Sequence, residues 1–168
     1  PKSRELKAKS YSIIANIPYY LTGELMRKIF EKWPQPQQVI LMLQKEVAER
    51  IVAKDGKESV LSLSVGAYSA PHILFSVPRG NFWPIPSVDS AVLEIIPKKI
   101  RGLNYENFFR GVKIGFASKR QTILNNMRRG MNLERSEMEN LLRKADISPD
   151  ARAEDLDIAS WIRLSKLV

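Results

Sequence analysis

The segment at residues 11–19 reads YSIIANIPY and decides the fold, because it joins an apolar run to a polar loop. Residues 11–15 predict a buried β-strand, and Asn16 follows at its end. A helical pattern over residues 21–32 comes after the loop. Ligands bind at the carboxyl ends of strands in open α/β sheets, so residues 16–19 are placed where a binding site forms.

The rest of the chain alternates strands and helices at first and is helical afterwards. Further strands are predicted at residues 39–43, 72–77 and 90–96, and helices at residues 45–53 and 60–68. This alternation predicts βα units and a mainly parallel sheet. Four more helices are predicted at residues 105–116, 119–129, 135–145 and 158–167. We therefore predict an α/β domain over residues 1–99 and a small all-helical domain over residues 100–168.

The amino-acid composition excludes several kinds of functional site and favours one class of partner. The 168 residues include no cysteine, which excludes disulfides, thiolate metal ligands and a cysteine nucleophile. His72 is the single histidine, and its position at the start of a predicted strand indicates a structural role. No apolar run reaches the roughly 18 residues of a membrane span, so we expect a cytoplasmic protein. The net charge of +9 favours nucleic acid as the partner.

The groups at residues 16–19 suit methyl transfer to an aromatic amine. The N6 lone pair of adenine is delocalised into the ring and must be localised before it attacks a methyl group. The Asn16 side-chain oxygen and the Ile17 carbonyl can accept the two N6–H hydrogens, and Pro18 stiffens the loop. Tyr19 offers a flat face to an extruded base, worth about 1–3 kcal/mol. The alternative is a plain turn, because Asn and Pro favour turns for backbone reasons.

A second segment, FWPIPSVDSA at residues 82–91, contains two prolines that stiffen an extended loop before the last predicted strand. We predict that Phe82 faces Tyr19 across the base and forms the opposite wall of the site. For Trp83 we favour a role in capping the hydrophobic core.

A third segment, residues 107–133, carries six cations and no acidic residue. The cations are Arg110, Lys113, Lys119, Arg120, Arg128 and Arg129. The sequence SKRQ at residues 118–121 fits a capping box, which places Lys119 and Arg120 in the first turn of a helix. Cations there cost about 0.3–1 kcal/mol each, so we predict that they bind RNA phosphates. A solvated basic face is the alternative.

Taken in order, these segments resemble the KsgA/RsmA family of ribosomal RNA adenine dimethyltransferases over essentially the whole chain. The resemblance is carried by NIPY (16–19), MLQKEVAER (42–50), LSLSV (61–65), FWPIPSVDSA (82–91), FASKRQTILNN (116–126) and RAEDL (152–156). It implies the C-terminal part of a Rossmann-like class I methyltransferase sheet, followed by a helical domain that binds ribosomal RNA.

The resemblance also implies a cofactor, a substrate and a partner. The cofactor is S-adenosyl-L-methionine, and the substrate is two adjacent adenosines near the 3′ end of small-subunit ribosomal RNA, in a 30S-type pre-subunit. Asn16 would contact both donor and target amine, while Tyr19 and Phe82 flank the adenine. Three alternatives stay open: a large-subunit dimethyltransferase of the macrolide-resistance type, an RNA-binding or assembly module without catalysis, and a methyltransferase acting on DNA or a small molecule.

The sequence departs from the family in its donor site. The family's glycine-rich turn has no counterpart, because none of the eight glycines forms a G-x-G pair. We therefore expect that the chain is a piece of a longer protein, and that alone it binds the donor weakly or not at all and is inactive. The strand at residues 11–15 would then present an open edge.

Overall fold

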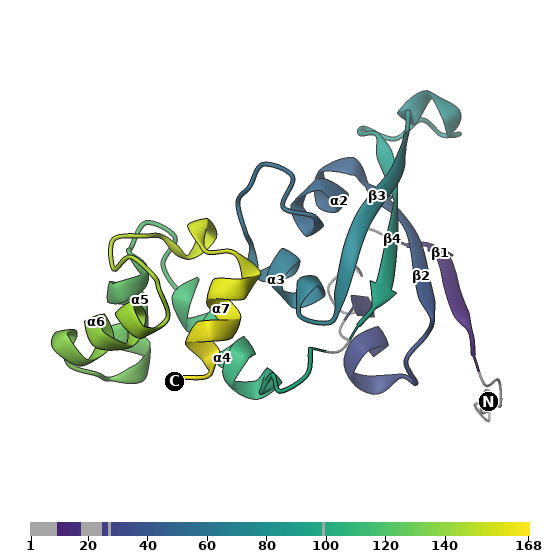
Figure 1. Cartoon of the computed structure of the whole chain (residues 1–168). Coiled ribbons are helices and arrows are strands. Elements are labelled where there is room, and N and C mark those ends of the chain that lie inside the picture. The colour runs from purple at the N-terminus through teal and green to yellow at the C-terminus, as the bar shows by residue number, and fades with distance from the viewer. Residues whose placement is uncertain (1–9, 18–24, 27, 99) are drawn as a thin grey trace. The chain divides into compact units, whose positions relative to one another are not determined.

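The computed structural model describes residues 10–17, 25–26, 28–98 and 100–168 (Figure 1). It divides into two compact units. Unit 1 comprises Pro1–Ala48 and Ser69–Lys98, and unit 2 comprises Glu49–Tyr68 and Lys99–Val168. Residues 49–68 thus belong with the helices that end the chain. The assignment of residues 1–99 to catalysis and 100–168 to RNA binding stays a prediction.

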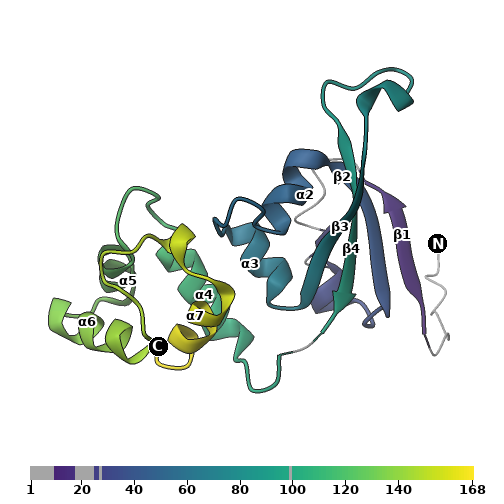
Figure 2. The ribbon, with the colours of Figure 1, turned by 45° about the horizontal axis from the view of Figure 1, so that its top comes forward.

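The sheet of unit 1 has four described strands in the order β1-β2-β4-β3. They are β1 (Ser12–Asn16), β2 (Gln38–Gln44), β3 (Ser69–Val77) and β4 (Ser90–Pro97). β1 and β2 pair in parallel, whereas β4 pairs antiparallel with both β2 and β3. β1, β2 and β3 therefore run in one direction and β4 runs in the other (Figure 2).

The prediction of a mainly parallel sheet is wrong, because β1 and β2 form the one parallel pair among the three described strand pairs, and the other two pairs are antiparallel. A parallel crossover needs a dozen or more residues and usually a helix. Residues 78–89 instead form a 3-10 turn, Arg79–Asn81, and an irregular loop. β3 and β4 are consequently joined as a hairpin, with β4 between β2 and β3.

One face of this sheet supplies the core of unit 1. The buried side chains, each at most 1% exposed, are Val39, Leu41, Leu43, Ala91, Leu93 and Ile95. They alternate along β2 and β4 because successive strand residues point to opposite faces. Of the helix predicted at residues 21–32, residues 21–24 and 27 lie outside the described residues, and the described part ends at Lys32 as the π-helical turn η2 (Lys28–Lys32). β1 is an edge of the described sheet, and Ile14 on it is 78% exposed.

Unit 2 packs helices around a core of its own. α2 (Lys45–Ile51) enters it from unit 1, and the others are α3 (Val60–Gly66), α4 (Tyr105–Gly115), α5 (Ile123–Met131), α6 (Arg135–Lys144) and α7 (Ile158–Ser165). Phe108, Met127, Met138 and Trp161 are each at most 1% exposed. The predicted helices are confirmed apart from the start of α5. Within the described ranges, no helix has the length and apolar character to cross a membrane.

The packing of α4 against α7 depends on Gly115. A Cβ atom at Gly115 would overlap the ring of Trp161 and come within 3.0 Å of Ile123 Cδ1. A Cβ atom at Gly111, one turn earlier on the same helix, would meet no heavy atom within 4 Å. The indole of Trp161 therefore occupies the space that a side chain at position 115 would need.

We expect Gly115→Ala to lower the free energy of unfolding by about 1–3 kcal/mol, because overpacking outweighs the better helix propensity of alanine. Gly111→Ala is the matched control and should raise that free energy by up to about 1 kcal/mol. Urea unfolding of both variants measures the difference. Equal stabilities would contradict the close contact with Trp161.

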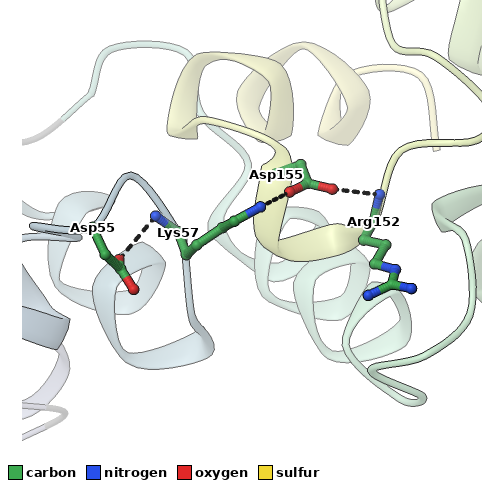
Figure 3. Close-up of polar contacts among 4 residues, drawn as sticks. All are labelled: Asp55, Lys57, Arg152 and Asp155. Atoms are coloured by element: carbon green, nitrogen blue, oxygen red, sulfur yellow. Dashed lines mark hydrogen bonds and ion pairs between the residues drawn. The ribbon is translucent and has the colours of Figure 1, made fainter.

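A polar clip, formed by Lys57, Glu58, Arg152, Glu154 and Asp155, joins two distant segments of unit 2. Figure 3 shows Lys57, Arg152 and Asp155 of this clip. The Lys57 ammonium donates to Asp155 Oδ1, and the Arg152 N–H donates to Asp155 Oδ2 at 3.1 Å. The Glu58 N–H donates to the Glu154 carbonyl at 2.8 Å. The hydrogen bonds from Lys57 and the Arg152 N–H lower the pKa of Asp155, and the Asp155 carboxylate raises the pKa of Lys57.

The lowered pKa of Asp155 makes the clip acid-sensitive. Its stabilisation is present above the carboxyl group's ordinary value of 3.8 and is lost as the pH falls through the lower folded-state value. Near neutral pH, Asp155→Asn should therefore have a lower melting temperature than the native chain. This difference in melting temperature should disappear below about pH 4. Asp150→Asn removes an exposed carboxylate outside the clip and serves as the control. A gap in melting temperature that stays constant down to strong acid would rule out this contribution.

Candidate catalytic segment and RNA-binding surface

Asn16 is the last residue of β1, and its backbone lies beside Met42 of β2. The Ile17 N–H donates to the Met42 carbonyl at 3.3 Å, which carries the pairing one residue beyond the strand. Ile17 is buried, whereas the Asn16 side chain is exposed and has no hydrogen-bond partner among the described residues. Its amide is therefore available to a ligand. Pro18 and Tyr19 lie outside the described residues.

The register of the sheet relates Asn16 to the loop at residues 78–89. One row across the strands contains Asn16, Met42, Val92 and Phe75, and the row two residues further contains Gln44, Ser90 and Val77. The loop leaves from the second row, about 7 Å beyond Asn16 along the strands. Figures 1 and 2 show this hairpin projecting past the ends of β1 and β2.

Asp89 holds the base of this loop. Its Oδ1 accepts the Arg79 N–H at 3.0 Å, and its carbonyl accepts the Lys45 N–H at 3.0 Å. The Arg79 guanidinium donates to the Ser87 carbonyl at 3.3 Å. These bonds close the loop on itself and attach it to the start of α2.

The two aromatic residues of the loop differ in burial. Phe82 is half-buried, whereas Trp83 is 92% exposed. The prediction that Trp83 caps the core is wrong, because the loop projects beyond the sheet and leaves the indole uncovered. The extended backbone of Phe82 (φ −119°, ψ 150°) directs the two side chains to opposite sides. That Phe82 faces Tyr19 stays a prediction.

His72 lies inside β3, directly opposite Glu94 of β4, with Nε2 2.5 Å from Glu94 Oε2. Gln38 donates to the other oxygen of Glu94. The histidine thus belongs to a cross-strand polar cluster, the kind of pairing that supports a sheet. Across the described part of the chain, no group of three or more histidine and acidic side chains could hold a metal ion.

The start of α5 differs from the predicted one. Thr122 is the N-cap, with its Oγ1 accepting the Asn125 N–H at 3.3 Å, so the helix begins at Ile123. Residues 118–121 form a turn closed by the Gln121 N–H and the Ser118 carbonyl at 3.1 Å. The capping box predicted from Ser118 is wrong. Lys119 and Arg120 lie in the turn, and the macrodipole cost that supported their phosphate role does not apply there.

A buried amide, which the sequence analysis missed, holds this turn in place. Asn126 is 6% exposed, and its Nδ2 donates to the Gly115 carbonyl at 2.6 Å and the Ser118 carbonyl at 3.0 Å. It therefore fixes the end of α4 to the turn. The signal was present in the sequence, because Asn126 shares the buried stripe of α5 with Ile123 and Met127, where an apolar residue is expected.

The six predicted RNA-binding cations lie on two consecutive helices, α4 and α5, and on the turn between them at residues 118–121. We call these two helices and their turn the basic pair. Five are exposed and Arg128 is half-exposed, and none forms an ion pair with a described residue: Arg110, Lys113, Lys119, Arg120, Arg128 and Arg129. A Cβ atom at Gly130 would overlap Ile114, so the end of α5 packs on α4. The RNA-binding role of these side chains stays a prediction.

A sequence model of the family described as ribosomal RNA adenine dimethylase matches residues 2–168. The chain belongs to this family. Ribosomal RNA small subunit methyltransferase A of Dehalococcoides mccartyi is 39% identical over 157 residues, covering 92% of this chain and 54% of that protein. The protein of the same name from Mycoplasmopsis pulmonis is 43% identical over 125 residues, covering 73% and 50%. The chain spans about half the length of the curated relatives it matches.

Two solved structures have the same fold as this dimethylase-family chain. A dimethyladenosine transferase from Plasmodium falciparum has a TM-score of 0.74 and 26% identity, covering 95% of this chain and 66% of the other. The 23S rRNA methyltransferase ErmE has a TM-score of 0.76 and 21% identity, covering 98% and 68%, and this likeness concerns the fold. The predicted Rossmann-like methyltransferase fold and the resemblance to the KsgA/RsmA family are confirmed.

If the basic pair of this dimethylase-family chain binds RNA phosphates, Lys119→Glu with Arg120→Glu will weaken RNA binding without unfolding the chain. Each lost phosphate contact should reduce the slope of log affinity against log salt by about 0.7–0.9. Arg143→Glu with Lys144→Glu, two exposed cations of α6, makes the same charge change outside the basic pair. Salt titrations of binding should show a larger change of slope for the first variant. Identical slopes in both variants would remove the turn from the interface.

Proposed function

We propose that this protein transfers methyl groups from S-adenosyl-L-methionine to N6 of two adjacent adenosines near the 3′ end of small-subunit ribosomal RNA. Each adenosine would be methylated twice. Membership of the adenine dimethylase family supports the reaction, and relatives named as small-subunit methyltransferases support the substrate. The observation that carries the proposal is the exposed Asn16 amide beside the buried Ile17, at the carboxyl end of β1.

The roles of Asn16 and Ile17 follow from the electronic structure of adenine. In the first transfer, the Asn16 side-chain oxygen and the Ile17 carbonyl accept the two N6–H hydrogens and localise the nitrogen lone pair. In the second transfer, one N6–H hydrogen remains for one of these two acceptors. S-adenosyl-L-methionine, when bound, supplies an electrophilic methyl group in line with that lone pair. The methylated ammonium is acidic enough to lose its proton to water, so the site needs no general base.

The flat faces of Phe82 and Tyr19 hold the base. Stacking between two aromatic side chains selects a planar ring and contributes about 1–3 kcal/mol per contact. Phe82 is half-buried in a loop whose base is held by Asp89, so its ring is oriented before RNA binds. Such preorganisation reduces the entropy lost on binding.

Asn16 also fits a contact with the methyl donor, because its amide is exposed at the end of a strand and carries both a donor and an acceptor. It is the one residue of this chain that we assign to the donor. The basic pair would bind the phosphates of the RNA, since phosphate contacts position a nucleic acid without reading its sequence. The partner is then the small-subunit ribosomal RNA in a 30S-type pre-subunit, and the reaction takes place in the cytoplasm.

Asn16→Ala should reduce methyl transfer roughly a hundredfold, the scale for removing one preorganised polar group from a reaction site, while RNA affinity changes less than about twofold. The experiment uses the longest natural form of the protein and small-subunit particles that lack the modification. Labelled methyl incorporation and filter binding give the two readouts.

Ser12→Ala, at the other exposed end of β1, is the control and should keep full activity. Undiminished methylation by Asn16→Ala would disprove the role of its amide. Methylation of large-subunit RNA in place of small-subunit RNA would disprove the proposed substrate.

A further inference from the structure

Trp83 is the most exposed large hydrophobic residue reported for the described chain, at 92%. It stands in a loop that is stiffened by Pro84 and Pro86 and held at its base by Asp89. A loop held in this way has lost much of its backbone freedom before a partner binds, which reduces the entropy lost on binding. Indole rings supply large flat contact areas with only two side-chain torsions.

We propose that Trp83 is a stacking platform for an unpaired RNA base that neighbours the target adenosine. This inference extends the proposed function and rests on it. Because the backbone at Phe82 is extended, the Phe82 and Trp83 side chains leave the chain on opposite sides, and we assign them to different bases. Phe82 is left for the target adenine, and Trp83 for a base elsewhere on the strand.

The position of the loop fits this second contact. β4 lies two strands away from β1, a lateral separation of about 10 Å, and the loop starts about 7 Å beyond the row of Asn16. The loop that carries Trp83 therefore starts near Asn16, at the same end of the sheet, where one RNA strand can meet both. Bases next to an extruded nucleotide lose a stacking neighbour, and an aromatic side chain can replace it.

The charge of the loop favours RNA over a protein partner. Residues 78–88 contain Arg79 and no acidic residue, so a phosphate backbone meets no like charge there. The one carboxylate at the base of the loop, Asp89, accepts the Arg79 N–H. Ile85 and Val88 are also exposed, at 60% and 40%, and they provide the internal comparison: a protein contact would use them together with Trp83, whereas a base stack uses the indole alone.

The test measures binding of a short single-stranded oligoadenylate containing one 2-aminopurine to the 168-residue chain. Trp83→Ala should weaken binding about tenfold, the scale of one base–aromatic stack, and Trp83→Phe should recover part of the loss. Ile85→Ala should bind as the native chain does. 2-Aminopurine fluorescence should be quenched by the native chain and not by Trp83→Ala.

The salt dependence separates this contact from the basic pair. A base stack releases no counterions, so Trp83→Ala should lower affinity with an unchanged slope, whereas Lys119→Glu with Arg120→Glu should lower the slope. Native-like affinity in Trp83→Ala, while the Lys119 and Arg120 variant still loses affinity, would overturn the stacking role and leave the proposed function standing. An equal loss in Ile85→Ala, or self-association of the native chain that Trp83→Ala abolishes, would show a protein-contact surface and also overturn it. If the native chain does not bind the oligonucleotide, the stacking role of Trp83 is also overturned. The methylation assay then decides the proposed function separately.

Discussion

Strand β4 pairs along both of its edges, and this pairing determines where the candidate residues of unit 1 lie. Because β4 fills the place between β2 and β3, the chain must leave β3 and enter β4 at the carboxyl ends of the three co-directional strands. Asn16 ends β1 at the same side of the sheet. A segment near the start of the chain and an aromatic loop far from it in sequence are therefore presented together. Asp89 completes the arrangement by holding the loop to itself and to α2.

In unit 2, side-chain packing and one buried amide hold the elements of the basic pair in place. The cations of the basic pair form no ion pair with a described residue, so other contacts hold the elements that carry them. Gly115 lets Trp161 pack against the end of α4, and Asn126 of α5 donates to the carbonyls of Gly115, at the end of α4, and Ser118, in the turn that follows. Satisfied buried amides are worth retaining, because leaving their partner carbonyls unpaired costs about 1–3 kcal/mol each. These contacts fix the positions of α4, the turn and α5, which carry the cations of the basic pair.

The elements of both units could be predicted from local patterns, whereas their pairing and one helix start could not. Ser118 and Thr122 are both suitable N-caps, and each is followed three residues later by a side-chain amide. Contacts from elsewhere decide between them: the Asn126 amide occupies the Ser118 carbonyl, and the Ile123 N–H donates to the Ala151 carbonyl at 2.7 Å. Similarly, the order of strands depends on contacts distant in sequence. Trp83 was assigned to the core on residue type, and the projection of its loop reversed that assignment.

Under the proposed function, the cations, the aromatic side chains and the acceptors at Asn16 and Ile17 have different roles. These roles limit how the protein can select a particular adenosine. Cations bind phosphates of any sequence, and aromatic stacking accepts every base, so neither reads identity. The Asn16 oxygen and the Ile17 carbonyl test for an amino group at one position of a planar ring, which distinguishes adenine from bases that lack it there. They do not distinguish one adenosine from another. Selection among adenosines must therefore come from the shape of the RNA, which determines which bases are left unpaired and can enter the site at Asn16.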